Sequence, residues 1–223
     1  MRVALVIPAH NEEKNIQSVI EKSISYVDWV IIINDGSSDG TKKTCEASRC
    51  DKKIILLNHK INLGKGSALK TGCEAARKLG ADIIITIDSD GQHPPEYIPK
   101  ILQYMESNKL DFVFTVRQGG DKMPFIRFLG NKVLNLTARC LFNINLKDMW
   151  CGFRAFRISC LPKISWNKSD YSGEVQMALK VGKNNVIYGE YVIPTIYNDN
   201  VKGVHIMHGL KLLLQMIMWR IML

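Results

Sequence analysis

Residues 83–92 read Ile-Ile-Ile-Thr-Ile-Asp-Ser-Asp-Gly-Gln, so an apolar run is followed at once by two aspartates one residue apart. Such a run predicts a buried β-strand that ends at the aspartates. Because side chains two apart on an extended backbone point the same way, we expect Asp88 and Asp90 to converge on one divalent cation. A polar turn explains the same residues without a metal, since Asp, Ser and Gly are ordinary turn formers. The choice between these interpretations depends on the rest of the chain.

The composition is that of a globular protein with an excess of positive charge. The chain has 223 residues, of which 46% are hydrophobic and 23% charged, so it is long and apolar enough to bury a sizeable core. Lys and Arg outnumber Asp and Glu by 30 to 21, and the formal charge of +9 favours anionic partners such as nucleotides or phospholipid surfaces. No nucleic-acid-binding motif accompanies this charge, so we expect no nucleic-acid partner.

Cysteine usage and hydropathy bear on the location of the protein. Six cysteines show neither a Cys-x-x-Cys pair nor a zinc-like spacing with His, and the chain opens with a strand-like run, so we expect free thiols in the cytoplasm. No internal stretch reaches the roughly 18 to 20 apolar residues of a membrane span. Residues 209–223 are apolar except for Lys211, Gln215 and Arg220, which fits an interfacial membrane helix and a core helix equally well.

Strand-like and helix-like segments alternate over the first half of the chain. Strands are predicted at residues 2–7, 29–33, 53–57, 82–87 and 111–115, and helices at 12–25, 40–47, 66–79 and 95–107. This alternation predicts an α/β fold with a single mostly parallel central sheet flanked by helices. Further on, we predict helices at 124–142 and near 173–181 and a strand near 185–193. No repeat or linker divides the chain, so we expect one domain over residues 1–208 and an apolar helix at 209–223.

The predicted strands end in polar stretches, at residues 8–12, 34–40, 62–66 and 88–90. In sheets of parallel strands the ligand lies beyond the carboxyl ends of the strands. We therefore expect a ligand site along this rim.

Four stretches at these strand ends resemble, in the same order, the motifs of the family 2 inverting glycosyltransferases. They are Val-Ile-Pro-Ala-His-Asn-Glu at 6–12, Asn-Asp-Gly-Ser-Ser-Asp-Gly-Thr at 34–41, Asn-Leu-Gly-Lys-Gly-Ser-Ala at 62–68 and Asp-Ser-Asp-Gly-Gln-His-Pro-Pro-Glu at 88–96. More narrowly, they are similar to polyprenyl-phosphate (dolichyl-phosphate) sugar synthases. The resemblance covers residues 2–120 and, more weakly, 121–208. It implies a GT-A fold, with a Rossmann-like nucleotide-sugar-binding half at 1–116 and an acceptor half at 117–208.

The resemblance also implies a nucleoside diphosphate sugar donor. Pro8, Ala9, Asn11 and Glu12 would line the pocket of the base and ribose, and Asp35 would contact the base. A carboxylate at a strand end can accept hydrogen bonds from a base or a sugar, which supports the role of Asp35. Uracil and guanine both fit such a pocket, so UDP-hexose and GDP-hexose both remain possible donors.

Lys65 stands between two glycines, but this is not the phosphate loop of an NTPase. That loop needs Ser or Thr after the lysine, and Gly66 stands there. We expect Lys65 to approach the donor, while Gly64 and Gly66 serve tight backbone geometry. Asp39 precedes a predicted helix and is expected to cap it.

Asp88 and Asp90 correspond to the Asp-x-Asp pair of the family. In that role they hold Mg²⁺ or Mn²⁺, which prefer oxygen ligands, and the cation offsets the charge that grows on the departing diphosphate. Gln92 resembles a further metal ligand, through its amide oxygen. His93 is expected to be structural.

Two arginines are the residues expected to bind the acceptor phosphate. A lipid phosphate needs no general base, because its second pKa of about 6 leaves it largely dianionic at neutral pH. Arg117 and Arg127 correspond to the acceptor-phosphate arginines of the synthases, and Arg offers the bidentate contacts that phosphate favours. Asp148 matches the Asp of the family segment Asp-x-x-x-Gly-Phe and would orient the acceptor, act as a base or fix its loop. The expected catalytic residues are therefore Asp90, Asp148 and Arg117.

Two further segments carry weaker expectations. Glu174 begins a predicted helix, where an acidic residue also simply complements the helix dipole. Residues 197–205 occupy the place of a mobile basic loop in the family, in which Lys202 and His205 would close over the donor diphosphate.

The sequence thus predicts a metal-dependent inverting glycosyltransferase that moves a hexose from a nucleoside diphosphate sugar to a polyprenyl (dolichyl) phosphate. It would act as a peripheral protein at the cytoplasmic face of the membrane. One alternative is a glycosyltransferase that acts on a sugar or glycan hydroxyl in cell-envelope polysaccharide or glycoprotein synthesis. The other is a non-catalytic nucleotide-sugar-binding module or anchoring subunit.

Overall fold

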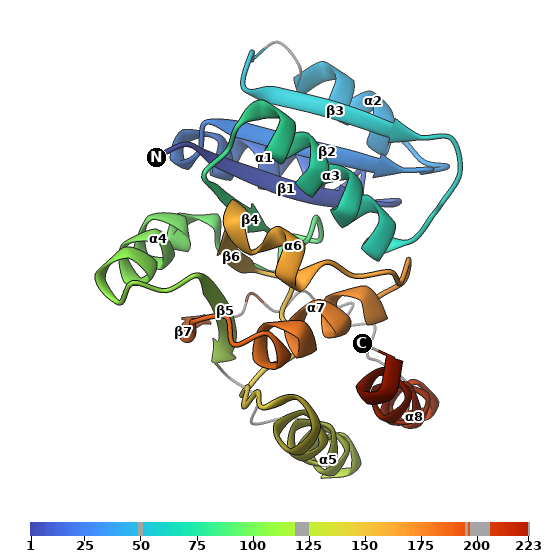
Figure 1. The fold of residues 1–223 in the computed structure, drawn as a ribbon. Helices are drawn as coiled ribbons and strands as arrows, with labels where there is room; N and C mark the ends of the chain where they lie inside the picture. The colour runs from blue at the N-terminus through green and yellow to red at the C-terminus, as the bar shows by residue number, and fades with distance from the viewer. Residues whose placement is uncertain (49–50, 119–124, 195, 197–205, 223) are drawn as a thin grey trace.

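The structure is a computed structural model that describes residues 1–48, 51–118, 125–194, 196 and 206–222, with only the backbone for 125–132, 206–212 and 222. Its centre is a seven-stranded sheet in the order β3-β2-β1-β4-β6-β5-β7 (Figure 1). The strands are β1 (Val3–Ala9), β2 (Trp29–Asp35), β3 (Ile54–His59), β4 (Ile83–Thr86), β5 (Phe112–Gln118), β6 (Arg154–Arg157) and β7 (Tyr188–Pro194).

The sheet is mostly parallel, as predicted. Strand β1 runs parallel to β2 and β4, β2 runs parallel to β3, and β5 runs parallel to β7. Strand β6 is antiparallel to both of its neighbours, β4 and β5. The sequence did not predict β6, because its four residues carry an arginine at each end and are too few for a strand pattern.

Helices cover both faces of the sheet. They are α1 (Ile16–Ser23), α2 (Thr41–Ser48), α3 (Lys65–Leu79), α4 (Ile98–Ser107), α5 (Phe125–Phe142), α6 (Leu161–Ile164), α7 (Ser172–Lys183) and α8 (Ile206–Met222), with 3₁₀ turns η1 (Ile24–Tyr26), η2 (Pro95–Tyr97) and η3 (Ile158–Cys160). Alternate residues of each strand enter separate cores. Ala4 and Val6 of β1 join the core under α3 and α7, while Leu5 and Ile7 join the core under α1 and α4.

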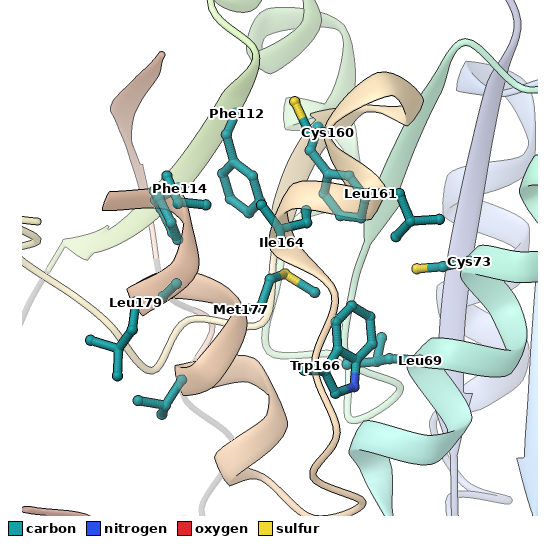
Figure 2. Close-up of a cluster of buried hydrophobic side chains, with 14 of the residues drawn as sticks. Leu69, Cys73, Phe112, Phe114, Cys160, Leu161, Ile164, Trp166, Met177 and Leu179 are labelled. Carbon is teal, nitrogen blue, oxygen red and sulfur yellow. The ribbon is translucent and has the colours of Figure 1, made fainter. Parts of the chain in front are cut away.

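The core on the α3 face joins the two halves of the chain. Figure 2 shows the ring of Trp166 beside Leu69 of α3, with Met177 of α7 and Phe112 of β5 in the same cluster. The indole Nε1 of Trp166 donates a hydrogen bond of 2.8 Å to the carbonyl oxygen of Gly66. The chain after β6 therefore holds the start of α3 in place.

Strand β4 ends two residues before Asp88, which corrects the expected strand at 82–87. Asp88 and Asp90 lie in the turn that follows, so strand alternation does not explain how they come together. The turn is held by a 2.9 Å hydrogen bond from the Ser89 hydroxyl to the carbonyl oxygen of Pro8, and Gly91 has a φ of 74° that favours glycine.

The last helix begins three residues earlier than predicted, at Ile206, and contacts α5. Met216 and Trp219 of α8 are buried in the core on the α3 face. Other apolar side chains of the same helix, among them Leu214 and Ile217, are exposed. Within the described part of the chain, no helix is both long enough and apolar enough to cross a membrane.

Candidate active site

Asp88 stands at the centre of a polar cluster beyond the end of β4. Its Oδ1 forms an ion pair with Nζ of Lys65, at the start of α3, over a distance of 2.6 Å. Its Oδ2 lies 3.4 Å from Nε2 of His93. Gly152 packs against the carboxylate so closely that a Cβ there would lie 2.5 Å from Oδ1. Burial opposes ionisation of Asp88, but Lys65 and His93 outweigh it and hold the pKa of Asp88 well below its usual range.

His93 is a member of this cluster, although the sequence suggested only a structural role. Its side chain is 3% exposed, and its Nδ1 lies 4.0 Å from the Sγ of Cys151. Burial lowers the pKa of His93, but the hydrogen bonds to Asp88 and Cys151 raise it to about 10 overall. His93 thus carries a positive charge at neutral pH and, together with Lys65, offsets the negative charge of Asp88.

Asp90 and Glu12 add negative charge beside Asp88. Oδ1 of Asp90 accepts a 3.0 Å hydrogen bond from the backbone N–H of Gln92. Burial, followed by the charge of Asp88, raises the pKa of Asp90. Burial also raises the pKa of Glu12, against a hydrogen bond from Asn15, and the charges of Asp90 and Asp88 add to the rise. A cation placed among these carboxylates would relieve their mutual repulsion.

The carboxylates of Asp88 and Asp90 offer the oxygen ligands that Mg²⁺ and Mn²⁺ prefer, and their role as metal ligands stays a prediction. Among the described residues, no three His, Cys, Asp or Glu side chains are already arranged as a metal site. Mg²⁺ sites often use only one or two carboxylates and complete the coordination with water and substrate phosphates. Asp88 and Asp90 would supply the carboxylates, and Gln92 a further oxygen.

Lys65 links the turn after β4 to helix α7. Its ammonium lies 2.6 Å from Asp88 and 2.8 Å from Oε2 of Glu174, and it is 5.5 Å from the centre of the Tyr171 ring. Burial alone lowers the pKa of Lys65, but the charges of Asp88 and Glu174 raise it above its ordinary value. The sequence made Glu174 only a weak candidate at a helix start and did not predict its pairing with Lys65, since no local signal connects the two residues.

The ends of β1 and β2 meet at the rim, as expected for nucleotide-binding residues. The backbone N–H of Asn11 donates to the hydroxyl of Ser37, and its Oδ1 accepts a 2.9 Å hydrogen bond from the backbone N–H of Ser38. The N–H of Glu12 donates to the hydroxyl of Thr41 over 2.8 Å. Both residues follow Pro8 and Ala9, which are buried at the end of β1.

Asp35 forms hydrogen bonds with the loop that precedes α3. Its carboxylate is 4% exposed and accepts hydrogen bonds from Nδ1 of His59 at 2.7 Å, the N–H of Leu63 at 2.9 Å and the N–H of Gly64 at 2.8 Å. It therefore positions the segment that carries Lys65. Contact with a nucleotide base stays a prediction for Asp35.

Two other predictions for this rim are confirmed. Oδ1 of Asp39 accepts a 3.0 Å hydrogen bond from the N–H of Thr41, the first residue of α2, which is the capping role expected from the sequence. Gly64 has a φ of 92°, and a Cβ on Gly66 would collide with the carbonyl oxygens of Lys168 and Asp170. Both glycines meet backbone constraints that other residues would disturb.

Arg117 and Asp148 form a bidentate ion pair near the end of β5. Nε of Arg117 lies 2.7 Å from Oδ2 of Asp148, and Nη2 lies 3.0 Å from Oδ1. Oδ1 also accepts a 3.1 Å hydrogen bond from the N–H of Trp150. Burial lowers the pKa of Arg117, but Asp148 raises it above its ordinary value. The structure thus brings together two of the predicted catalytic residues.

Arg154 supports the loop that carries Asp148. It is 1% exposed, and its guanidinium donates to the carbonyl oxygens of Met149 at 2.9 Å, Cys151 at 3.0 Å and Glu174 at 2.8 Å. One buried cation therefore ties the loop after Asp148 to the start of α7. The other predicted acceptor residues are not placed: the side chain of Arg127 in α5, and Lys202 and His205, lie outside the described residues.

Comparisons with known proteins agree with this geometry. Residues 4–164 match the model of the family described as Glycosyl transferase family 2. The chain is 32% identical over 238 residues to the UDP-N-acetylglucosamine–dolichyl-phosphate N-acetylglucosaminyltransferase of Methanococcus voltae, covering 97% of this chain and 95% of that protein. It is 35% identical over 163 residues to the undecaprenyl-phosphate 4-deoxy-4-formamido-L-arabinose transferase of Pectobacterium carotovorum, covering 70% of this chain and 48% of that protein.

Solved structures share the fold. One is glucosyl-3-phosphoglycerate synthase from Mycobacterium tuberculosis in complex with Mn²⁺, UDP and phosphoglyceric acid, with a TM-score of 0.75 and 19% identity over 98% of this chain and 78% of that chain. The fold and the family match define a glycosyltransferase with the GT-A fold. The chain belongs to glycosyl transferase family 2, as the motifs of the sequence predicted.

Proposed function

We propose that this glycosyltransferase moves a hexose unit from a UDP-linked sugar to a polyprenyl phosphate, with Mg²⁺ or Mn²⁺ at Asp88 and Asp90. The observation that carries this proposal is the Arg117–Asp148 pair, which holds a guanidinium rather than an open base at the acceptor side. The Methanococcus voltae relative, whose name states a dolichyl-phosphate acceptor, supports it over nearly the whole chain.

The chemistry assigns separate tasks to the two sides of the site. An oxygen of the acceptor phosphate attacks the anomeric carbon, and the bond from that carbon to the diphosphate breaks, so that its electron pair leaves with UDP. Asp88, Asp90 and Gln92 would hold the metal, which stabilises negative charge on the leaving diphosphate. Arg117 would orient the attacking phosphate through a fork of N–H donors, and Arg127 would add a second cation.

The nucleotide would bind at the joined ends of β1 and β2. Pro8, Ala9, Asn11 and Glu12 would face the base and ribose, with Asp35 behind them. Asn11 has a φ of 57°, and its contacts with Ser37 and Ser38 fix the loop in that conformation. Lys202 is proposed to approach the diphosphate.

Transfer to a sugar hydroxyl is the alternative, and it needs a general base. Asp148 is the predicted candidate, but both of its oxygens already accept hydrogen bonds from Arg117, and one of them also accepts from Trp150. This arrangement favours a phosphate acceptor. A non-catalytic binding module is disfavoured because the chain retains both acidic residues of the Asp-x-Asp motif, Asp88 and Asp90.

A membrane-facing surface would bring the lipid phosphate to this site. The paired helices α5 and α8 lie side by side at one end of the molecule, away from β1–β3 (Figure 1). Exposed apolar side chains gather on them: Val133, Leu136, Leu214, Ile217, Met218 and Ile221. We propose that this α5/α8 face lies against the cytoplasmic surface of a membrane.

The test is a transfer assay with the whole protein. Vesicles containing dolichyl phosphate or undecaprenyl phosphate are incubated with radiolabelled UDP-N-acetylglucosamine, UDP-glucose or GDP-mannose, and with Mg²⁺, Mn²⁺ or a chelator. We expect label in the lipid extract with a UDP-sugar, and its loss with the chelator. Label that appears only on soluble glycans would favour the hydroxyl acceptor. A protein that binds UDP but neither transfers nor hydrolyses any donor would contradict an enzymatic role.

A further inference from the structure

Lys65 is held by two carboxylates at once, a partly buried one of Asp88 and a buried one of Glu174. Its Nζ lies 2.6 Å from Oδ1 of Asp88 and 2.8 Å from Oε2 of Glu174, and its side chain is 15% exposed. The two carboxylates come from different parts of the fold, because Asp88 follows β4 and Glu174 lies in the first turn of α7. One ammonium therefore bridges a proposed metal ligand and a residue of the predicted acceptor half.

Glu174 retains an unused hydrogen-bond acceptor. Its side chain is 8% exposed, and within the described part of the chain its Oε1 is buried without a hydrogen-bond partner. Leaving a buried carboxylate oxygen unpaired is unfavourable, so an unpaired oxygen in a native protein calls for an explanation, and its use in another arrangement of the site is one. Lys65 is the cation beside it, and the ammonium has three rotatable donors on a flexible stem.

The same ammonium occupies an oxygen of Asp88 that a divalent cation would need. Two cations beside one carboxylate repel each other, so a metal bound at Asp88 weakens the attraction between Asp88 and Lys65. Glu174 offers the ammonium a second carboxylate, whose Oε2 already lies 2.8 Å from Nζ and whose Oε1 has no partner among the described residues. Tyr171, whose ring centre lies 5.5 Å from Nζ, provides an aromatic face on the same side.

We propose that Lys65 is an exchangeable counter-ion that neutralises Asp88 in the metal-free protein and transfers to Glu174 when a divalent cation binds. Glu174 is then a positioning residue, which acts on the metal site through Lys65. This inference rests on the proposed metal role of Asp88. It assigns to Glu174 a function that its place at a helix start did not indicate.

The inference is tested by Mn²⁺ binding to the whole protein, measured by electron paramagnetic resonance with and without saturating UDP. We expect Glu174→Gln to weaken Mn²⁺ binding by about tenfold, as is usual for residues that support a metal ligand, because Lys65 then stays on Asp88. Glu174→Asp keeps the charge and should restore binding to within about threefold of the natural protein. Glu74→Gln, which removes an exposed carboxylate from α3, is the matched control and should leave binding unchanged.

A double-variant cycle separates this role from a simple effect of negative charge. In a Lys65→Met background, Glu174→Gln should change the Mn²⁺ dissociation constant by less than about threefold, because no ammonium remains to be moved. An equal loss in both backgrounds would show that Glu174 acts only by its charge and would overturn the proposal.

If Lys65→Met does not fold, a structure of the natural protein with Mn²⁺ and UDP tests whether Lys65 moves from Asp88 to Glu174. We expect Nζ of Lys65 to leave Asp88 and to contact both oxygens of Glu174. An ammonium still bound to Asp88 beside the metal would contradict the exchange while leaving the transfer reaction intact. No Mn²⁺ binding by the natural protein at all would remove both the proposed metal site and this inference.

Discussion

Arg117 and Asp148 form a pair whose geometry bears directly on the proposed acceptor chemistry. The bidentate geometry fixes the plane of the guanidinium and engages both oxygens of the carboxylate. Nε and Nη2 of Arg117 donate hydrogen bonds to Asp148. The N–H groups of the guanidinium that do not contact Asp148 are therefore the ones that would bind an incoming phosphate. At the residue scale, the pair is therefore built to present a cation in one orientation.

Replacing Arg117 by lysine tests this orientation. Lysine keeps the charge but loses the planar fork, so we expect the KM for polyprenyl phosphate to rise by about tenfold or more, while the KM for the UDP-sugar changes little. Asp148→Asn should raise the same KM by a smaller factor, because the amide still contacts the guanidinium. Steady-state kinetics with varied lipid phosphate measures both effects.

The matched control is Arg77→Lys, which alters an exposed arginine of α3 that pairs with Glu74. It should leave both KM values as they are. A rise confined to the KM for the UDP-sugar would place Arg117 on the donor side and contradict the proposed role.

At the scale of single elements, the first turn of α3 is positioned by segments from both halves of the chain. Asp35 accepts from the N–H of Gly64, and the N–H of Ser67 donates to the carbonyl oxygen of Ser169 over 3.1 Å. The indole of Trp166 reaches the carbonyl oxygen of Gly66. These contacts, together with the close packing at Gly66, aim the first residue of α3, Lys65, at Asp88.

Gly66→Ala tests how tightly this turn is packed. The added Cβ would collide with backbone carbonyl oxygens of residues 168–170, which cannot turn aside as a side chain can. We expect the free energy of unfolding to fall by about 2 kcal/mol, as in other overpacked sites, when it is measured by urea denaturation.

Gly40→Ala provides the control, because its Cβ would meet only the flexible end of the Glu13 side chain. That change should cost less than about 0.5 kcal/mol, as for most surface substitutions. Equal losses in the two variants would show that the contact between α3 and residues 168–170 does not constrain the turn.

At the scale of the whole molecule, the proposed donor site and the proposed membrane contact lie on different parts of the fold. The sheet presents the rim where β1, β2 and β4 end, and α5 and α8 present apolar side chains away from β1–β3 (Figure 1). On α8, Met216 and Trp219 are buried, whereas Leu214 and Ile217 are 57% and 48% exposed. The helix thus has one side for the core and another for the proposed membrane contact.

The double variant Leu214→Glu with Ile217→Glu tests that contact. Both side chains are exposed, so the melting temperature should change little, whereas sedimentation with anionic vesicles should fall by about tenfold or more. Ile187→Glu alters an apolar residue that is 59% exposed outside the α5/α8 face and should leave vesicle binding unchanged. Unaltered binding of the double variant would show that this face does not contact lipid.

The local sequence was sufficient for the strands and helices of the first half. Apolar runs such as residues 83–86 and 30–33 are buried in the structure as strands covered on both faces, and the polar stretches after them fall at one rim because the strands are parallel. The motifs at those strand ends predicted the family, which the comparisons confirm, while the donor-side roles of their residues stay predictions. The division of the chain at residue 116 into a donor half and an acceptor half stays a prediction.

The tertiary structure alone decided which distant residues complete the site. Strand β6 is too short to show a pattern, yet it stands between β4 and β5 and brings Gly152 against Asp88. Arg154 and Glu174 became part of the site through contacts between segments far apart in the chain. Periodicity and motifs report which face of an element is buried. The pairing of Lys65 with Glu174 depends instead on how α7 packs against α3. The close packing of the core that the two helices share sets this arrangement.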